Sequence, residues 1–381
     1  MSDLYTANTL SRFWGLDSEL RAEVWQAAIE EGTHLLPEEV RTRAQNSWDD
    51  IVELILGEGQ FGPDHWQLSR AKWLYYDIIR LLLPRQMRPV LRCLLRFRQM
   101  NSAFLGWPVE DRYVRFLYAV LELVQKRYPD VRPAPFWPGD AHFAFVITHD
   151  VETAKGHAFV RRVLDLEQNL GFCSSFNFVP EGYRVDENLL DELRTRGFEI
   201  GVHGLNHDGK LFSSRAEFER RAERINIYLR EWGAVGFRAP FVHRHPEWMQ
   251  ALEMEYDSSF FDTDPTQTIP GGTMSIWPFF CGRFVELPYT LAQDHILFEI
   301  SEQFGPKLWL DKIDFIARWG GMALMCVHPD YMRDPSRLRV YETFLREMLD
   351  RAQRSAENGF IYYWHALPRD VARRWRQRAG L

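Results

Sequence analysis

The stretch VITHDVETA, residues 146–154, places His149, Asp150 and Glu152 directly behind an apolar run. That run, HFAFVI at residues 142–147, is short and rich in aromatic and β-branched residues, so it predicts a buried strand. Ionisable side chains at the carboxyl end of a strand are where α/β folds usually place their chemistry. Two interpretations follow: a catalytic edge, or a polar loop where a strand reaches the surface.

Composition and charge narrow the class of protein. With 381 residues, the chain is long enough for two domains or for one barrel with an appendage. It is 46% hydrophobic and 26% charged, as ordinary globular proteins are, and we find no internal repeat. The net charge of -7 argues against nucleic-acid binding as the main function, because such domains usually carry a positive balance. We therefore expect no nucleic-acid partner.

The cysteines and the first residues bear on the compartment. Cys93, Cys173, Cys281 and Cys326 are widely spaced and form no CxxC pair, so we expect reduced, buried thiols. MSDLYTANTLSRFWG lacks a basic region followed by an apolar one, and no stretch reaches the roughly 18 apolar residues of a membrane span. We expect a cytoplasmic protein, with a peripheral position at the inner membrane face as the alternative.

Two regions follow one another along the chain. Residues 1–128 contain runs with apolar residues at three- and four-residue spacing, which predicts a helical N-terminal domain. YPDVRPAPFWPGD, residues 128–140, then packs four prolines into thirteen residues. Such a composition predicts a linker, at residues 129–140. The second domain is expected to span residues 141–381.

Beyond the linker, strand-like and helical runs alternate. This alternation predicts parallel strands with right-handed crossovers, hence an α/β barrel or a doubly wound sheet. We favour the barrel because polar motifs end so many successive strands. Residues 262–282 are expected to form a long loop. The strand-like runs are CSSFNFVP (173–180), FEIGVHG (198–204), VGFRAPF (235–241), YDSSFF (256–261), RFVELPYT (283–290) and MALMCVHPDY (322–331).

A metal site is the first chemical hypothesis. In HGLNH, His203 and His207 are four residues apart and can meet one ion if the segment is helical or tightly turned. Asp150 and Glu152 point to the same side of an extended segment, so both could enter one pocket. Two histidines, one carboxylate and an open position form a common catalytic zinc arrangement. The alternatives are two loop histidines and a Glu152 that caps the next helix and faces solvent.

Two further residues could complete an active site. Arg238, in RAPF, could hold Asp150 ionised through a charge-assisted hydrogen bond, or be a surface arginine before a proline turn. His328 closes a very apolar strand in VHP. A lone histidine there is more often structural, but near a metal it suits a general acid.

The motifs HDVE, HGLNH, RAPF, YDSS and CVHPDY, in this order and each at a predicted strand end, resemble those of the polysaccharide deacetylase (NodB-homology) family, carbohydrate esterase family 4 and its relatives. The resemblance covers about residues 140–331. It implies a distorted (β/α) barrel, a divalent metal and hydrolysis of an acetamido group. Zinc is the metal expected first, with cobalt, nickel or manganese as alternatives.

By position, the resemblance also implies a role for each residue. Asp150 is the catalytic base, Arg238 orients it, and His328 is the general acid. Asp257, in YDSS, matches an acid that supports the active site. The implied metal ligands are Glu152, His203 and His207.

The chain departs from the family pattern at three points. It has Asp-Val-Glu where many members have adjacent aspartates, so its carboxylate ligand is one methylene longer. Gly204 stands where a serine or threonine usually follows the first metal histidine. The tryptophan common in the fourth motif is replaced by SSFF, residues 258–261. These differences bear on the substrate.

The expected function is removal of acetyl groups from N-acetylated sugars of a cell-surface or exopolysaccharide glycan or its precursor. A catalytically weak carbohydrate-binding or scaffold protein on the same barrel is one alternative. An amidase for a non-sugar amide is another. The oligomeric state is left open.

Two other patterns have competing interpretations. Residues 84–99, PRQMRPVLRCLLRFRQ, carry an arginine stripe that predicts either peripheral membrane contact or an exposed face over a buried core. GEGQFG, residues 57–62, formally satisfies GxGxxG. Because it follows a helical run and precedes a proline, we interpret it as a helix end and loop, and expect no dinucleotide site.

Overall fold

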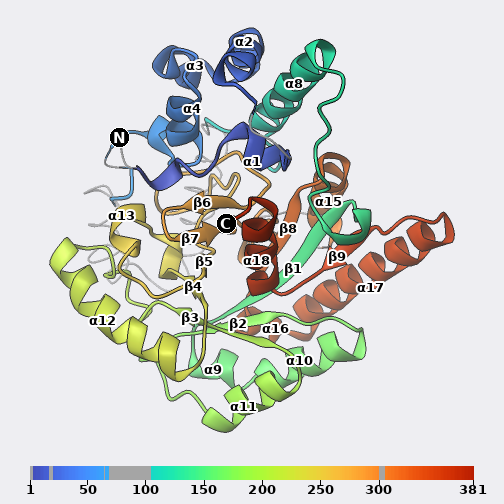
Figure 1. Cartoon of the computed structure of the whole chain (residues 1–381). Coiled ribbons are helices and arrows are strands. Elements are labelled where there is room, and N and C mark those ends of the chain that lie inside the picture. Colours follow the sequence, from blue (N-terminus) through green and yellow to red (C-terminus); the bar gives the residue numbers. More distant parts are fainter. Residues whose placement is uncertain (1–2, 17–19, 64, 68–103, 300–304) are drawn as a thin grey trace.

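One curled sheet forms the centre of the molecule in the computed structural model, which describes residues 3–16, 20–63, 65–67, 104–299 and 305–381 (Figure 1). Within these residues, nine strands form the sheet in the order β6, β7, β5, β4, β3, β2, β1 and β8, and β9 pairs with β1. The paired strands are parallel except for β6 and β7. The strands are β1 (Phe143–Val151), β2 (Ser175–Phe178), β3 (Glu199–His203), β4 (Gly236–Arg238), β5 (Tyr256–Asp257), β6 (Phe279–Cys281), β7 (Phe284–Glu286), β8 (Met322–Val327) and β9 (Tyr363–His365).

The apolar run at residues 142–147 forms most of β1, which pairs with three other strands. All nine residues of β1 are buried, as expected of a strand covered on both faces of a parallel sheet. β8 runs along one edge of β1 at residues 144–149, whereas β9 and β2 share the other edge. The carboxyl end of β1 therefore lies between β2 and β8.

Helices surround the sheet on its outer side (Figure 1). Several begin at the residue types that favour helix starts: Ser214 caps α12, and Asp334 caps α17 with a proline at its first position. The helices of this region are α9 (Ala154–His157), α10 (Val160–Asn169), α11 (Glu187–Thr195), α12 (Arg215–Glu231), α13 (Pro246–Met249), α14 (Asp294–Glu299), α15 (Lys307–Trp319), α16 (Pro329–Met332), α17 (Pro335–Glu357) and α18 (Pro368–Arg378).

A side-chain hydroxyl helps to close the curled sheet. Beyond β7 the chain reaches β8, where the Thr290 backbone N–H donates to Leu324 O over 3.2 Å. The Thr290 hydroxyl donates to Met322 O at 2.7 Å and accepts from the Leu324 N–H at 3.1 Å. This seam joins the two sides of the sheet into a distorted barrel. The predicted fold class, a distorted (β/α) barrel with N-terminal helices, is confirmed.

The last helix, α18, contacts β1, β5 and β7. Its Arg369 N–H donates to Glu199, the first residue of β3, over 3.2 Å. Glu199 also accepts from the Tyr256 hydroxyl at 2.9 Å, and the exposed Arg373 pairs with Glu255 at 2.8 Å. These contacts place α18 at the amino ends of the strands, opposite the strand ends that carry the predicted site.

The described part of the N-terminal region consists of helices joined by turns and loops. Its helices are α1 (Leu10–Trp14), α2 (Ala22–Gly32), α3 (Glu38–Ala44), α4 (Trp48–Ile55) and α8 (Arg112–Arg127), with 3-10 turns η1 (Asp3–Tyr5), η2 (Thr33–Leu35) and η3 (Gly59–Phe61). α3 and α4 are separate helices, because Gln45 and Asn46 between them are left-handed. Ser47 then caps α4, accepting from the Asp50 N–H.

The N-terminal helices pack directly on the barrel. The Asn8 side chain donates to Phe280 O and accepts from the Phe280 N–H, both over 2.8 Å. Phe13 makes an edge-on contact with Trp277. The domain limits 1–128, 129–140 and 141–381 stay predictions. The arginine-rich residues 84–99, with Cys93, lie outside the described part of the chain.

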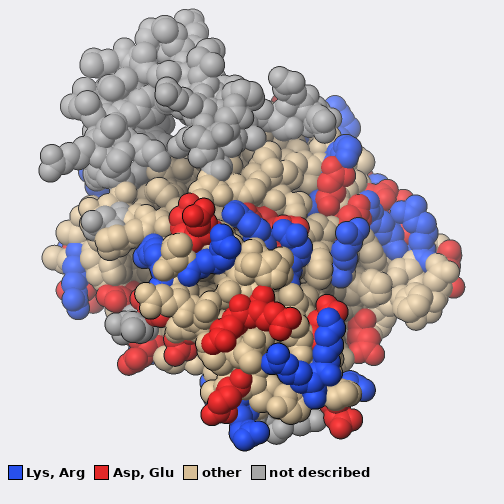
Figure 2. Space-filling view, turned by 90° about the horizontal axis from the view of Figure 1, so that it is seen from above, with Lys and Arg blue, Asp and Glu red and all other residues tan. Residues whose placement is uncertain are grey.

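Some elements differ from the sequence predictions. β6 lies within the expected long loop at residues 262–282, and β9 was not predicted; each has three residues, too few for a visible period. Cys281 and Cys326 are buried free thiols as predicted, whereas Cys173 is only half-buried. In the described residues, none of the helices has both the length and the apolar character needed to cross a membrane. Figure 2 shows acidic and basic side chains interspersed over the described surface of one face.

Candidate functional site

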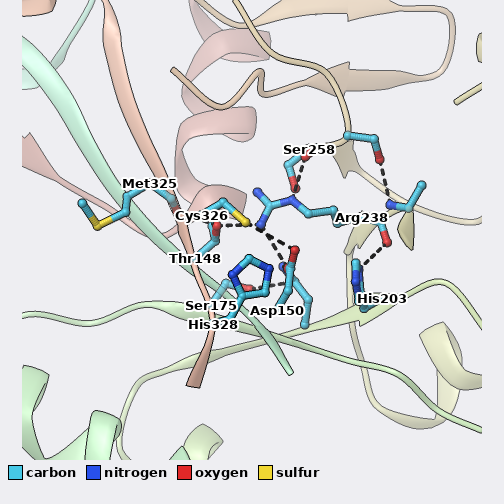
Figure 3. Close-up of polar contacts among 12 residues, drawn as sticks. Thr148, Asp150, Ser175, His203, Arg238, Ser258, Met325, Cys326 and His328 are labelled. Atoms are coloured by element: carbon cyan, nitrogen blue, oxygen red, sulfur yellow. Dashed lines mark hydrogen bonds and ion pairs between the residues drawn. The ribbon is translucent and has the colours of Figure 1, made fainter. Parts of the chain in front are cut away.

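The carboxyl ends of neighbouring strands bring the predicted site residues to one end of the barrel. Asp150 is next to last in β1, His203 ends β3 and Arg238 ends β4. The parallel register sets His203 directly beside Arg238. His328 follows β8, which pairs along β1. Figure 3 shows these four side chains converging from their separate strands.

The three predicted metal ligands come together. Glu152, His203 and His207 each offer one ligand atom, and these atoms lie within 4.8 Å of one another. Nδ1 of His203 is 3.0 Å from the carbonyl oxygen of Arg238, to which it must donate, and this leaves Nε2 with a lone pair. Nε2 of His207 lies 3.0 Å from Glu152 Oε1, without the geometry of a hydrogen bond.

The imidazole nitrogens of this group have the character of metal ligands. Nε2 of His203 and Nε2 of His207 are both buried without a hydrogen-bond partner in the described part of the chain. Buried polar atoms are nearly always partnered, so two such nitrogens beside a carboxylate fit a divalent ion. Glu152, His203 and His207 are therefore the residues that could hold the metal.

The protonation states of the group also suit a cation. Burial lowers the pKa of His203 to about 4, which keeps its imidazole neutral. Burial alone would raise the pKa of Glu152, but the neighbouring His207, His328 and His203 outweigh it and lower the pKa to about 2. Metal ligands must be deprotonated, and both groups are so at neutral pH.

A second group of potential ligands lies beside the first. Ligand atoms of Asp150, Cys326 and His328 are also within 4.8 Å of one another. However, Oδ1 of Asp150 already accepts from Asn177, and Oδ2 accepts from the Cys326 thiol at 3.3 Å. Arg238 supplies a positive charge to the same carboxylate. This group therefore suits proton transfer better than cation binding.

Asp150 is held as a buried carboxylate. Nη1 of Arg238 lies 3.1 Å from Oδ1, and Nδ2 of Asn177 donates to the same oxygen over 2.9 Å. Although burial opposes the charge, Arg238 holds the pKa of Asp150 well below its usual range. Arg238 is itself fixed by donating to Ser258 O at 2.7 Å and to the Thr148 hydroxyl at 2.8 Å (Figure 3). The alternative of a surface arginine is wrong, because this side chain is fully buried.

His328 has a partner that the sequence did not reveal. Its Nδ1 lies 2.7 Å from Oδ1 of Asp294, and its backbone N–H donates to Oδ2 over 2.7 Å. Burial opposes the imidazolium, but the carboxylates of Asp294, Glu152 and Asp150 raise the pKa of His328 to about 10. Asp294 begins α14 rather than ending a strand, so no strand-end motif pointed to it.

Glu152 does not cap the following helix, which corrects one of the two sequence interpretations. Thr153 caps α9 instead, accepting from the backbone N–H groups of Lys155 and Gly156. Asp330 accepts from the Glu152 N–H over 3.2 Å and from the Thr153 hydroxyl. This second acid missed at the sequence level therefore anchors the loop that carries Glu152.

Solved structures of other proteins share the fold of this chain. A protein described as a polysaccharide deacetylase from Mycobacterium smegmatis aligns over 64% of this chain and 93% of its own, at 20% identity and a TM-score of 0.51. Another, from Pseudomonas aeruginosa PAO1, aligns over 66% and 96%, at 19% identity and a TM-score of 0.51. The chain has the polysaccharide deacetylase fold. No protein-family model matches its sequence, and no protein of curated function matches it either.

One departure from the polysaccharide deacetylase motifs has a local structural reason. Gly204 is left-handed, with φ of +63°, a conformation that residues with a side chain rarely adopt. A Cβ at this position would lie 2.5 Å from Cδ of Pro240. A serine here would therefore require the turn at Pro240 to move.

Asp257, in the fourth motif of the polysaccharide deacetylase fold, is buried away from these ligands. It accepts from the Ser259 hydroxyl at 2.7 Å and from the Ser259 N–H at 3.0 Å. Burial raises the pKa of both Asp257 and its neighbour Glu286, so the two carboxyl groups retain protons more strongly than usual. The structure thus places Asp257 in a carboxyl pair with Glu286, while its supporting catalytic role stays a prediction.

His149 lies on the other side of β1. Its Nε2 is 2.6 Å from Oε1 of Glu167, and its ring stacks on Phe176 at 4.5 Å. Successive side chains in a strand point to opposite faces, so His149 faces the helices while Asp150 faces the interior. Its contacts are structural.

Proposed function

We propose that this protein is a metal-dependent deacetylase that removes acetyl groups from N-acetylated sugars of a cell-surface or exopolysaccharide glycan or its precursor. The observation that carries the proposal is the pair of buried, unpartnered imidazole nitrogens beside Glu152, adjacent to an ionised Asp150 and a protonated His328. The description of structurally similar proteins as polysaccharide deacetylases supports this choice of substrate class.

The chemistry divides between the two groups of residues. A divalent ion, most simply zinc, held by Glu152, His203 and His207 would polarise the amide carbonyl and acidify a water molecule. Asp150, kept ionised by Arg238, accepts the proton of the attacking water. Oδ1 of Asp150 is fixed by Asn177 and Arg238, which orients the carboxylate toward the interior.

Proton donation to the departing nitrogen falls to His328. Asp294 accepts from Nδ1, so the proton on Nε2 is free to face the substrate. Nε2 of His328 lies 3.7 Å from Oε1 of Glu152, which places the acid next to the proposed metal ligands. Asp150 and His328 thus hold opposite charge states in one site, as a base and an acid require.

Acetate release in the presence and absence of a chelator tests the proposal. The substrates are a panel of N-acetylated oligosaccharides and lipid-linked sugars, and the purified protein is first analysed for bound metal. We expect acetate from at least one substrate, its loss after chelation, and recovery when zinc, cobalt, nickel or manganese is added. Release that persists in chelator would exclude the metal mechanism.

The same assay separates the two alternatives. Protein that binds carbohydrate but contains no stoichiometric metal and releases no acetate would be a carbohydrate-binding or scaffold protein. Metal-dependent hydrolysis of simple amides, with every N-acetylated sugar inert, would identify an amidase for a non-sugar substrate.

A further inference from the structure

Glu58, in the GEGQFG stretch after α4, buries its carboxylate against Arg244 and Gly272 of the barrel region. Its side chain is only 1% exposed. Oε2 accepts from Nε of Arg244 at 2.8 Å, while Oε1 accepts from Nη2 of Arg244 and from the Gly272 N–H. Burial opposes the charge, but Arg244 and then His65 outweigh it and lower the pKa of Glu58 to about 2. The N-terminal region thus contributes one half of a buried ion pair.

Arg244 also contacts the turn that follows β4. Its Nη1 donates to the carbonyl oxygen of Val242 over 2.8 Å. Its guanidinium carbon lies 4.7 Å from the ring centroids of both Phe260 and Phe261, which fixes the plane of the group. Arg244 therefore connects Glu58 to one particular backbone carbonyl.

The turn that holds this carbonyl is strained. In η6 (Pro240–Val242), Phe241 has φ of 57° and Val242 has φ of 49°. A left-handed conformation is unfavourable for a residue with a side chain, and a β-branched valine adopts it very rarely. Such conformations persist only where the surroundings enforce them. The hydrogen bond from Arg244 is a contact that can do so.

The strained turn forms one wall of the proposed metal site. The Phe241 ring packs against the His207 ring, with 4.4 Å between their centroids. Pro240 abuts Gly204, the residue after His203. Relaxation of the turn would therefore displace the surroundings of both histidine ligands.

We propose that Glu58 and Arg244 are positioning residues for the metal site, holding the turn at residues 240–242 so that His203 and His207 keep their ligand geometry. This inference rests on the proposed function in one respect, namely that these histidines bind a metal. The proposal gives the N-terminal region a function, because Glu58 belongs to that region and would stabilise the metal site of the barrel.

The chain offers a matched control for this ion pair. Lys312 and Asp262 form another buried pair, with side chains 2% and 1% exposed. Lys312 also donates to Pro108 O, so this pair too connects the barrel to the chain that precedes it. The contacts described for Lys312 and Asp262 do not include the turn at residues 240–242. Loss of this pair should therefore affect stability alone.

The test compares Glu58→Gln with Asp262→Asn in the full-length protein. The affinity for Zn²⁺ is measured by competition with a chromophoric chelator, and backbone hydrogen exchange is followed in peptides covering residues 238–245. We expect Glu58→Gln to weaken Zn²⁺ binding about 10–100-fold, the usual effect of losing a residue that orients a ligand. Exchange in the turn should also accelerate. Asp262→Asn should lower the melting temperature and leave both other readouts unchanged.

Equal effects of the two substitutions on Zn²⁺ affinity and on turn exchange would overturn the proposal. Should Glu58→Gln fail to fold, Arg244→Lys is measured in the same way, and unchanged Zn²⁺ affinity in that variant has the same consequence. Neither readout requires acetate release. A wild-type protein that binds Zn²⁺ but deacetylates no substrate would therefore contradict the proposed function and leave the positioning role to be decided by these variants.

Discussion

Asp150 and His328 lie a few ångströms apart, yet their environments hold them in opposite charge states. The Asp150 carboxylate accepts from Arg238 and Asn177, whereas the His328 imidazole donates to Asp294. We expect Asp150→Asn to retain metal and to lose turnover by at least about 100-fold, the usual contribution of a general base. His203→Ala should lose both bound metal and turnover, because it removes one of the proposed metal ligands. Metal analysis and acetate release measure the two effects, and full activity in Asp150→Asn would exclude Asp150 as the base.

A second prediction concerns the charge of His328. Its pKa of about 10 means that the imidazole is protonated at neutral pH and loses its proton as the pH rises through that value. Asp294→Asn removes the carboxylate chiefly responsible, so the pKa should fall toward the ordinary value of about 6.5. The alkaline limb of kcat/KM against pH should shift to lower pH by at least about one unit. Asp311→Asn, at an exposed acid of α15, should leave the limb in place, and an unshifted limb in Asp294→Asn would contradict the assignment.

The sequence indicated the three candidate ligand residues, which the structure brings together, but not the acids that support the site. Glu152, His203 and His207 could be found because each follows an apolar, strand-like run. Asp294 and Asp330 could not, since each begins or lies in a helix and meets its partner only through the fold. Their carboxylates look like ordinary residues of a helix's first turn, where acids are common for local reasons.

At the scale of elements, the attachment of α18 should depend on pH. Glu199 receives hydrogen bonds from Tyr256 and from the start of α18, and burial raises its pKa to about 7. The folded state binds this proton more tightly than the unfolded chain, so the free energy of unfolding should fall as the pH rises from about 4.5 to about 7. The loss should be on the order of 3 kcal/mol.

Glu199→Gln, which cannot ionise, should remove this dependence. Its melting temperature relative to that of the native chain should rise across the pH window and then level off. Thermal unfolding at several pH values between 4 and 8 measures this. Glu255→Gln is the matched control, because Glu255 also contacts α18, through an ion pair with Arg373 at the surface. Curves for Glu199→Gln and the native chain that remain parallel would contradict the prediction.

The alternation of strands and helices could be predicted from the sequence, whereas the shortest strands, β6 and β9, could not. β1 was predictable because five consecutive apolar residues, 143–147, open the strand. β6 and β9 have three residues each, and β9 is only half-buried, so neither carries a period that distinguishes a strand from a loop. Tertiary pairing decides their conformation.

At the scale of the whole molecule, the residues before the Pro-rich segment and those after it are in direct contact. Glu58 and Asn8 both bond to the barrel. Removing residues 1–128 would take away the carboxylate partner of Arg244 and expose the barrel surface that the N-terminal helices cover. Loss of one partner of a buried ion pair alone costs about 3–5 kcal/mol, a large part of the typical stability of a domain. We expect residues 129–381 alone to lack cooperative thermal unfolding in circular dichroism. A sharp transition near that of the full chain would show that the barrel is independent.

The seam at Thr290 has a consequence for the site as well. A substitution cannot remove the backbone hydrogen bonds of a sheet, but it can remove a side-chain hydroxyl. The Thr290 hydroxyl is therefore a contact that closes the barrel and that one substitution would delete. The same segment leads within four residues to Asp294, the partner of His328. Opening of the barrel at this seam would move Asp294 relative to His328, so we expect the closure of the sheet and the charge of this imidazole to depend on the same segment, residues 290–294.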